Sequence, residues 1–310
     1  MLSSLNAIVS RLRLKHLRLL IALDEQGSLH RAAQLVSISQ PGASKALHDI
    51  ETAFGASLFV RTSQGLQAND LGHCVIRYAR LIHSDLAHLR EEMVGILEGQ
   101  GGRLSVGVIM GAVPLLTQMV KSLRQSQPAL SIDIVEDTSA RLLALLDEGR
   151  LDLAICRSTV SRRPDAYDCL ALHDEAVEIV AHPCHPLATQ TEVDIGALAQ
   201  YSWVTYPIGM PMRLLLEREF AAAGLDVPRY GIETASTFTM LSLLNEDPTL
   251  LALMPSKVAE FGVQFGLVKP VPFTIAARNE PYGVIVRRGV PLSPPAELLM
   301  QELAGLSSHS

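Results

Sequence analysis

Short hydroxyl, amide and basic side chains share one face of a helix predicted over residues 41–54, together with the two residues before it. They are Ser39, Gln40, Ser44, Lys45 and His48. Side chains of these types can reach base edges and phosphates when a helix lies in the major groove of a duplex. The opposite face carries apolar residues at helical spacing, namely Ala43, Leu47, Ile50 and Phe54. The pattern predicts a helix that hides one side and offers the other to an external ligand.

The start of this helix is slender. Pro41 occupies the first predicted helical position, where its missing N–H is not needed, and Gly42 follows without a side chain. A duplex could therefore approach closely. A β-hairpin predicted over residues 57–68 carries Arg61, which is placed as a phosphate clamp beside the groove. Ser28, at the N-cap of the preceding helix, is a further residue that we expect to contact DNA.

The same pattern fits an ordinary helical subdomain with a solvated polar face, and total charge does not decide between the two. The chain of 310 residues has 26 basic and 32 acidic side chains, a net charge of −6, which disfavours polyanion binding over the whole surface. Residues 1–100 hold 10 basic and 9 acidic residues. A polyanion would therefore meet no net repulsion in this N-terminal third.

Other helices must position the polar segment. One runs from residue 14 to Gly27, and a second over 29–36 carries small residues where two helices can meet. A single long helix is predicted from Asp70 to about Leu97. A stripe recurs along it at intervals of three and four, with one acidic interruption: Leu71, Val75, Tyr78, Ile82, Asp85, Leu89, Met93 and Ile96. Such a helix spans roughly 40 Å, so we expect a partner helix to cover the stripe.

The pattern changes after the long helix. Residues 98–103, EGQGGR, have the composition of a linker. Strand-like runs then alternate with helical ones, as in RLSVGVI (103–109), LSIDIVE (130–136) and LDLAICR (151–157). This alternation predicts parallel sheets with crossover helices, an α/β fold.

The N-terminal segment resembles the LysR-type transcriptional regulators, whose pattern is FxxxxxxGSxxxAAxxLxxSQPxxSxxIxxLExxLGxxLFxR. The residues in register are Gly27, Ser28, Ala32, Ala33, Leu35, Ser39, Gln40, Pro41, Ser44, Lys45, Leu47, Ile50, Glu51, Phe54, Gly55, Leu58, Phe59 and Arg61. Later stretches are also similar to the family: LLALLDEGRLDLAICR (142–157), HPLA (185–188) and LLALMP (250–255).

Two positions depart from the family pattern. LQANDLG (66–72) stands where the family often has LTPAG, so the hydroxyl expected beside the phosphate backbone is absent at Gln67. Thr62 or Ser63 could replace it. Leu19 stands in place of a frequent phenylalanine. Neither change affects the expected fold.

The resemblance implies an α+β multidomain regulator that answers to a small-molecule effector. Its expected parts are a winged helix-turn-helix (1–69), a dimerisation linker helix (70–98) and a two-lobed α/β effector domain like a periplasmic binding protein (103–306). Lobe I would comprise 103–160 and 270–306, and lobe II 165–268. Members of the family usually form homotetramers from two dimers, bind promoter DNA as paired half-sites and alter its bend when a metabolite binds. RNA polymerase is a candidate further partner.

The effector is expected in the cleft between the lobes, on loops that follow strands. In lobe I these loops carry Met110, Gly111, Ala112, Thr138 and Ser139. In lobe II they carry Tyr206, Ile208, Gly209, Met210, Thr234, Ser236 and Thr237. Each could equally be a helix cap or an ordinary loop residue. Backbone N–H groups at 110–112 could hold an anion, and Arg157 could pair with an acidic effector or with Glu136 or Asp137.

Other functions find little support in the sequence. The four cysteines form no CxxC pair, and HPCHP (182–186) lacks zinc-like spacing, so we predict no metal and no cofactor. No secretory leader, membrane span or catalytic motif is present in the sequence, which favours a cytoplasmic protein that is not an enzyme. The rival interpretation is a cytoplasmic solute-binding protein or enzyme with an incidental helical extension. Residues 39–61 and the long helix argue against it.

Overall fold

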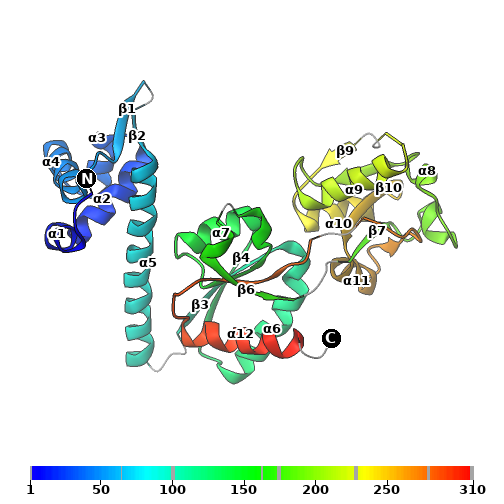
Figure 1. Cartoon of the computed structure of the whole chain (residues 1–310). Coiled ribbons are helices and arrows are strands. Elements are labelled where there is room, and N and C mark those ends of the chain that lie inside the picture. The colour runs from blue at the N-terminus through cyan, green and yellow to red at the C-terminus, as the bar shows by residue number, and fades with distance from the viewer. Residues whose placement is uncertain are drawn as a thin grey trace. The chain divides into compact units, whose positions relative to one another are not determined.

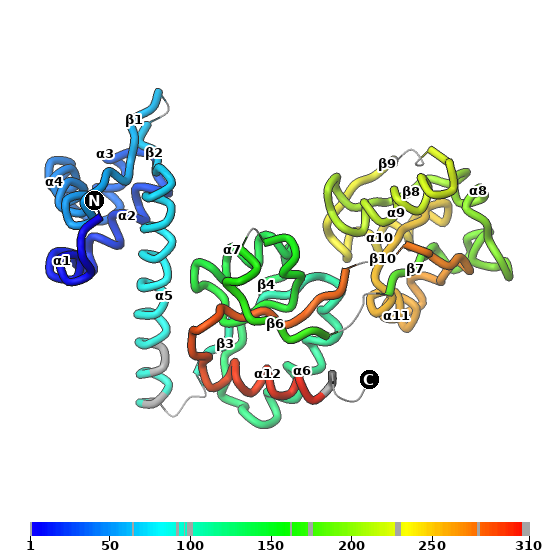
Figure 2. Tube along the Cα trace, viewed as in Figure 1, coloured from blue at the N-terminus to red at the C-terminus, as the bar shows by residue number. Residues whose placement is uncertain are grey.

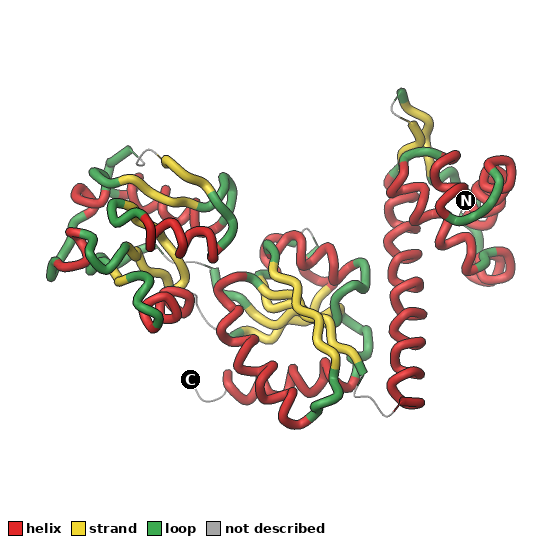
Figure 3. The backbone as a smooth tube through the Cα atoms, turned by 180° about the vertical axis from the view of Figure 1, so that it is seen from behind, coloured by secondary structure: helices red, strands yellow, loops and turns green. Residues whose placement is uncertain are grey.

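The computed structural model describes residues 2–63, 65–98, 102–161, 163–172, 176–226, 230–277 and 280–307. Contacts between Cα atoms divide the chain into two compact units, residues 1–103 with 144–151 and residues 104–143 with 152–310. Figure 1 labels the elements, Figure 2 traces the chain through them, and Figure 3 separates helices from strands. None of the described helices is both long and apolar enough to cross a membrane.

The N-terminal unit consists of helices and one small hairpin. Its elements are α1 (Leu5–Arg11), α2 (Leu14–Gln26), α3 (Leu29–Leu35), α4 (Gln40–Phe54), β1 (Phe59–Thr62), β2 (Gly65–Ala68) and α5 (Asp70–Glu98). A small apolar core lies between α2, α3, α4 and the start of α5. Its buried members include Leu17, Leu20, Leu23, Ala32, Ala33, Ala43, Ile50, Leu58, Ile76 and Ala79. This core sets the angle at which α4 is presented.

The ends of α2 and α4 follow from local signals. Gly27 ends α2 and Gly55 ends α4, both in the left-handed conformation that glycine adopts at little cost. The Ser39 hydroxyl oxygen accepts a hydrogen bond from the Gly42 N–H at 3.2 Å, which caps α4. The helix begins at Gln40, so Pro41 is its second residue rather than its first. Pro41 still precedes the positions whose N–H groups the helix needs.

The first sheet of the second unit has the strand order β4-β3-β5-β12-β6. Its strands are β3 (Arg103–Val108), β4 (Ser131–Glu136), β5 (Leu153–Cys156), β6 (Tyr167–Ala171) and β12 (Gly283–Arg287). The helices of this part of the chain are η1 (Met110–Ala112), α6 (Val113–Ser126), α7 (Ser139–Asp147), η2 (Ser158–Val160), η3 (Pro164–Ala166) and α12 (Pro294–Ser307).

The second sheet has the order β11-β7-β10-β8-β9. Its strands are β7 (Val177–Ala181), β8 (Ser202–Thr205), β9 (Tyr230–Glu233), β10 (Leu250–Pro255) and β11 (Lys269–Pro270). The helices are η4 (Pro186–Thr189), α8 (Ile195–Leu198), α9 (Pro211–Ala222), α10 (Thr237–Glu246) and α11 (Ser256–Gln264). Each of the two sheets forms the centre of one lobe.

The predicted lobe boundaries need correction. Residues 167–171, which we assigned to lobe II, form β6 and pair with β12 in the first sheet. Residues 269–270 form β11 and pair with β7, so the chain leaves the second sheet later than predicted. The sheets are also mixed rather than parallel, because β12 runs antiparallel to β5 and β6 and β7 runs antiparallel to β10. The described residues of lobe I are therefore 102–161, 163–172 and 280–307, and those of lobe II are 176–226 and 230–277.

Candidate nucleic-acid interface and ligand site

The polar side of α4 is open to solvent. The residues expected there are all exposed: Ser39, Gln40, Pro41, Ser44, Lys45 and His48. The apolar side behaves as predicted, since Ala43 and Ile50 are buried in the core and Leu47 and Phe54 pack against them. The helix therefore presents a polar ridge on a rigid support.

One flank of α4 borders an open hollow of about 630 Å³, which we call the wing hollow. Five of the residues expected to contact DNA line it: Ser28, Gln40, Ser44, His48 and Arg61. Ser28 is at the N-cap of α3, but its side chain makes no capping hydrogen bond. His30 and Arg31 on α3 also line the hollow, and they were missed in the sequence because their helix was considered only as support.

The hairpin is fixed to α4 by Glu51. One carboxylate oxygen accepts hydrogen bonds from the backbone N–H of Leu58 at 2.7 Å and of Phe59 at 3.3 Å. Backbone donors around a carboxylate partly offset its charge. Arg61, two residues further on β1, is exposed beside the polar ridge.

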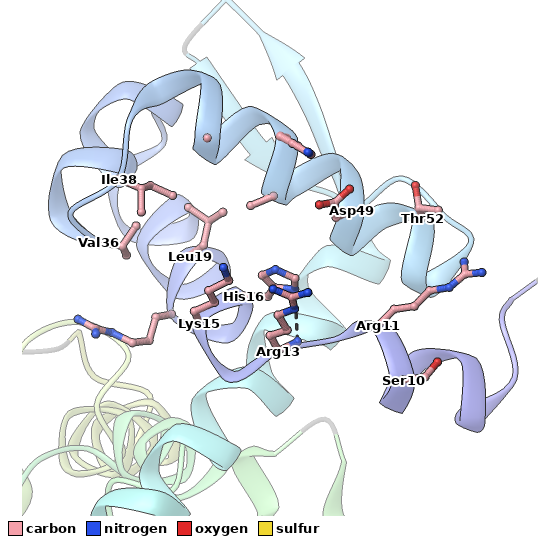
Figure 4. A pocket seen from close by; sticks show the side chains of 14 residues that line it. Ser10, Arg11, Arg13, Lys15, His16, Leu19, Val36, Ile38, Asp49 and Thr52 are labelled. Atoms are coloured by element: carbon pink, nitrogen blue, oxygen red, sulfur yellow. Dashed lines mark hydrogen bonds between the residues drawn. The ribbon is translucent and has the colours of Figure 1, made fainter.

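The other flank of α4 borders a larger hollow of about 740 Å³, which we call the α1 hollow. Its wall carries Arg11 from α1, Arg13 from the turn before α2, Lys15 and Arg18 from α2, and Lys45 from α4. Figure 4 shows Asp49 and Thr52 on α4 at one side of this hollow and Arg11, Arg13 and Lys15 at the other. Of these cations, only Lys45 was predicted to contact DNA. Four basic residues within eight positions, 11–18, were the available signal.

His16 lies at the bottom of the α1 hollow and is buried. Its Nδ1 accepts a hydrogen bond from the Arg13 N–H at 3.3 Å, drawn as a dashed line in Figure 4. Burial is the main reason that the pKa of His16 is lowered from 6.5; Lys15 and Arg13 lower it further, and Asp49 opposes them. The neutral ring thus acts as an acceptor at the start of α2.

The helix α5 spans Asp70–Glu98, matching the predicted linker helix. Near its start, Ile76 and Ala79 are buried against the core, and Arg80 forms a salt bridge with Asp24 at 2.9 Å. Large apolar residues along it are exposed: Leu71, Tyr78, Ile82, Leu86, Leu89, Met93 and Leu97. Val75 packs on the core instead, and the side chain of Ile96 lies outside the described residues.

In lobe I, the expected ligand residues follow β3 and β4. Met110, Gly111 and Ala112 form η1, and the Ala112 N–H donates to the Ile109 carbonyl at 2.9 Å, so it is not free for an anion. Thr138 Oγ1 accepts from the Arg141 N–H at 3.4 Å.

Ser139 is buried, and its Oγ accepts a hydrogen bond from the Arg157 N–H at 3.2 Å. The Arg157 side chain is also buried, and its Nε donates to the Glu280 carbonyl at 2.9 Å. These contacts tie the ends of β4, β5 and β12 together.

In lobe II, the expected residues follow β8 and β9. Ile208 is 82% exposed, Gly209 has φ +85°, and Met210 is the N-cap of α9. Ser236 Oγ accepts from the Thr239 N–H at 3.2 Å, so it acts as the cap of α10. The strand ends are joined because the Thr234 N–H donates to the Thr205 carbonyl at 2.9 Å.

Two further side chains belong to this edge of lobe II. Thr234 Oγ1 accepts from the Ser236 N–H at 3.1 Å, whereas the buried Thr237 Oγ1 has no hydrogen-bond partner among the described residues. Phe238, next to it on α10, is 81% exposed.

The two lobes touch at residues expected in the ligand site. The Tyr206 hydroxyl lies 3.2 Å from Met110 Sδ, and Met110 packs against the core of the second lobe. The strand ends of β3 and β8 therefore meet. Met110 and Tyr206 are brought together, and the contact is apolar apart from the hydroxyl.

Among the other chemically reactive side chains, two cysteines and the histidines of HPCHP are held within the fold by burial or hydrogen bonds. Burial raises the pKa of Cys156 to about 12, and burial also raises that of Cys169. In HPCHP, His182 Nδ1 accepts from the Cys184 N–H and His185 Nδ1 from the Leu187 N–H, both at 3.0 Å. No cluster of three potential metal ligands occurs among the described residues.

Two family models match the chain. The model of the bacterial regulatory helix-turn-helix protein, lysR family, matches residues 14–73, and that of the LysR substrate binding domain matches residues 97–307. The HTH-type transcriptional regulator GbpR of Azospirillum brasilense is 34% identical over 300 residues, which cover 96% of this chain and 87% of the relative. The small neutral protease regulatory protein of Streptomyces coelicolor is 32% identical over 238 residues, covering 74% and 75%.

Solved structures agree in fold. CbnR, a LysR family transcriptional regulator, aligns with a TM-score of 0.65 at 17% identity, over 96% of this chain and 99% of CbnR. CbnR complexed with its target DNA aligns with 0.64 at 19% identity, over 96% and 100%. The effector binding domain of QuiR in complex with shikimate aligns with 0.54 at 18% identity, over 67% and 98%. The two family models and the relative that is 34% identical show that the chain belongs to the LysR family of bacterial transcriptional regulators, with a DNA-binding helix-turn-helix followed by an effector-binding domain.

Proposed function

We propose that the chain recognises promoter DNA by placing α4 in the major groove. The observation that carries the proposal is the exposed polar ridge of α4, with the wing hollow beside it and Arg61 on the hairpin. An α-helix with side chains is about 10–12 Å across and the major groove is about 12 Å wide, so the ridge fits the groove. The apolar face of α4 remains in the core.

The side chains divide between base edges and backbone. Gln40, Ser44, Lys45 and His48 follow the ridge and carry donors or acceptors for base edges. Ser39 and Pro41 lie at the tip of the helix, where the chain comes nearest to the duplex. Ser28 and Arg61 line the wing hollow and are assigned to phosphate oxygens, which position the protein without reading sequence.

The exposed stripe of α5 supports a homodimer. Side chains such as Tyr78 (56% exposed), Leu89 (53%) and Met93 (55%) lie along one helix. A second copy of α5 packed against it would remove this apolar surface from water. Two copies would present two α4 helices to paired half-sites. We extend the proposal to a homotetramer of two dimers that acts on RNA polymerase in the cytoplasm.

A small organic metabolite is the proposed effector. It would bind at the ends of β3, β4, β8 and β9, at the residues predicted from the sequence. Exposed Ile208 and Phe238 supply apolar surface, and the hydroxyls of Thr138, Ser139, Thr234, Ser236 and Thr237 supply polar contacts. Binding there would bias the relative position of the lobes, since β3 and β8 meet through Met110 and Tyr206.

The test is an electrophoretic mobility shift of the full chain on its own upstream region and on a scrambled duplex. We expect specific binding that weakens by on the order of a thousandfold between about 50 and about 200 mM salt, because phosphate neutralisation releases counterions. Equal, weak binding of both duplexes, with and without metabolites, would refute promoter recognition.

A thermal-shift screen of organic acids, aromatics and sugars on the full chain tests the effector site. A binder present at about 100 times its dissociation constant should add about 2.7 kcal/mol of stability. The rival function, solute binding without DNA, predicts a ligand-dependent shift but no specific mobility shift.

A further inference from the structure

The α1 helix is an addition in front of the helix-turn-helix. The family model begins at residue 14, so α1 (Leu5–Arg11) lies outside the matched segment. It is nevertheless part of the folded unit. The Ser3 N–H donates to the Phe54 carbonyl at 3.1 Å, at the end of α4, and Leu12 packs on the core. The α1 helix and the turn after it are therefore held beside α4.

The α1 hollow is surrounded by positive charge, of which the added segment supplies Arg11 and Arg13. Arg11, Arg13, Lys15, Arg18 and Lys45 line it, and all five are exposed. Asp49 is the single acidic residue among the described residues of its lining. Within the described part of the chain, none of the five cations forms a salt bridge. The charge is available to an anion from outside.

The two hollows lie on opposite flanks of α4. Gly42, Lys45, Ala46, Asp49 and Thr52 line the α1 hollow. Gln40, Ser44, Leu47, His48 and Glu51 line the wing hollow. Each row has helical spacing, and the two rows are about half a turn apart around the axis. The polar ridge runs between them, with Lys45 on both the ridge and the α1 hollow.

A duplex on the ridge must meet both flanks. Because α4 nearly fills the width of the major groove, the two phosphate backbones that border the groove run along its two sides. Arg61 and Ser28 are on the flank of the wing hollow. The backbone of the other strand then falls at the α1 hollow, where it meets unpaired cations rather than solvent.

We propose that the α1 hollow is a second phosphodiester site, in which Arg11 and Arg13 bind the backbone of the strand on the far side of the groove from the hairpin. This inference rests on the proposed recognition of promoter DNA by α4. Arg11 and Arg13 act as donors to phosphate oxygens and so strengthen binding to every duplex. An acidic protein segment would fit the same charge, but DNA on the ridge already brings phosphates to this hollow.

The experiment compares the full chain with the double variant Arg11→Ala/Arg13→Ala. The Arg13 backbone bond to His16 does not involve the side chain, so the start of α2 is kept. Lys121→Ala/Arg124→Ala on α6, which removes two exposed basic residues of the other unit, is the charge-matched control. Circular dichroism checks the fold. Binding to the upstream region and to random duplex is measured across salt, with ethylation interference on each strand.

We expect the slope of log affinity against log salt to fall by about 1.8 in the double variant, which is about 0.9 for each lost phosphate. The affinity ratio of wild type to variant then decreases about twelvefold between about 50 and about 200 mM salt. Within each half-site, interference should disappear from one strand, and Arg61→Ala should remove it from the other. Arg11→Lys/Arg13→Lys should restore most of the slope, because the charges remain.

An unchanged slope with unchanged interference overturns the second site. Wild-type interference that is confined, within each half-site, to the strand that Arg61 contacts also overturns it. The wild-type measurement stands even if the alanine variant does not fold. If the wild type itself shows no specific, salt-sensitive binding, the proposed function has failed. If the wild type binds specifically and with salt sensitivity, and the folded double variant binds in the same way, only the second site has failed.

Discussion

Gly65 at the start of β2 lies against the backbone of Gly27 in the turn between α2 and α3. The Leu66 N–H donates to the Gly27 carbonyl oxygen at 2.9 Å, and a Cβ on Gly65 would overlap that same oxygen. The backbone of Gly65 has φ +120°, a region that side chains disfavour. The position of the hairpin, and with it Arg61, depends on a glycine at this point.

Gly65→Ala should therefore displace the hairpin. Backbone strain alone costs about 1–3 kcal/mol, and the overlap adds to it. We expect a lower free energy of unfolding in urea and weaker DNA binding in a mobility shift. Gly224→Ala is the matched control, because Gly224 also has positive φ (+71°) but no atom within 4 Å of the added Cβ. A hairpin variant that binds DNA like the wild type would contradict this docking.

Lys45→Ala tests whether the ridge of α4 reads sequence. If Lys45 contacts a base edge, its loss should weaken the specific complex by about 1–3 kcal/mol and relax preference at one position. Binding is measured on the upstream region and on single-base variants of it. An equal loss on every duplex would instead assign Lys45 to the backbone, together with its neighbours in the α1 hollow.

Leu89→Asp should split the dimer. Leu89 is 53% exposed in the single chain and lies in the middle of the α5 stripe, where a partner would bury the new charge at high cost. Sedimentation velocity should show the monomer. The control is Ala87→Asp, two residues earlier and so on roughly the opposite side of α5. A Leu89→Asp protein that remains dimeric would remove the stripe from the interface.

Acid should destabilise the N-terminal unit through His16. Its pKa in the folded protein is lowered from 6.5, chiefly by burial. Because the pKa of His16 is lower in the folded than in the unfolded protein, it contributes stability to the fold above pH 6.5. This contribution is lost as the pH falls below 6.5 and through the pKa of the folded state. The unfolding free energy of the wild type should therefore drop between about pH 7 and about pH 5.

His16→Gln should reduce this drop. A glutamine at the third helical position keeps an acceptor for the Arg13 N–H but does not titrate. Urea unfolding at both pH values measures the difference. His83→Gln, which removes an exposed imidazole from α5, should leave the drop as it is. A drop of the same size in His16→Gln would show that other groups cause it.

Ile208→Ala tests the effector site in lobe II. Because Ile208 is 82% exposed, the variant should unfold within about 0.5 kcal/mol of the wild type in the absence of ligand. The rise in melting temperature produced by a screened effector should be smaller. Val290→Ala, another exposed aliphatic position, should keep the full rise. An undiminished rise in Ile208→Ala would place the ligand elsewhere.

The sequence was informative where the signals are local. Ser39 before α4, Gly55 after it and the apolar row between them are short-range features, and they located the helix to within one residue. The bounds of α5 were found in the same way. The helix α1 was missed although Ser4, Ile8 and Leu12 have helical spacing, because this stretch was considered only as a possible leader.

The sequence predictions failed where the structure depends on contacts between residues that are far apart in the sequence. β6 belongs to lobe I because Tyr167 pairs with Arg287, 120 residues later, and no periodicity within 165–172 reveals that partner. The α1 hollow is similar. Arg11 and Lys45 are far apart in sequence and come together only through the packing of α1 against α4. Residues proposed for the effector site, such as Ser236, fit a helix cap and a ligand contact equally well, and the sequence cannot separate the two roles.

The backbone hydrogen bond between Ser3 and Phe54 fixes the start of the chain beside the end of α4. Any peptide fused ahead of residue 2 would emerge next to the end of α4, on the head that meets DNA. An affinity tag placed there would shield Arg11 and Arg13 from the duplex, whereas one attached after α12 begins in the other unit. Binding constants measured with the two fusions should differ, and the C-terminal version is the one to trust.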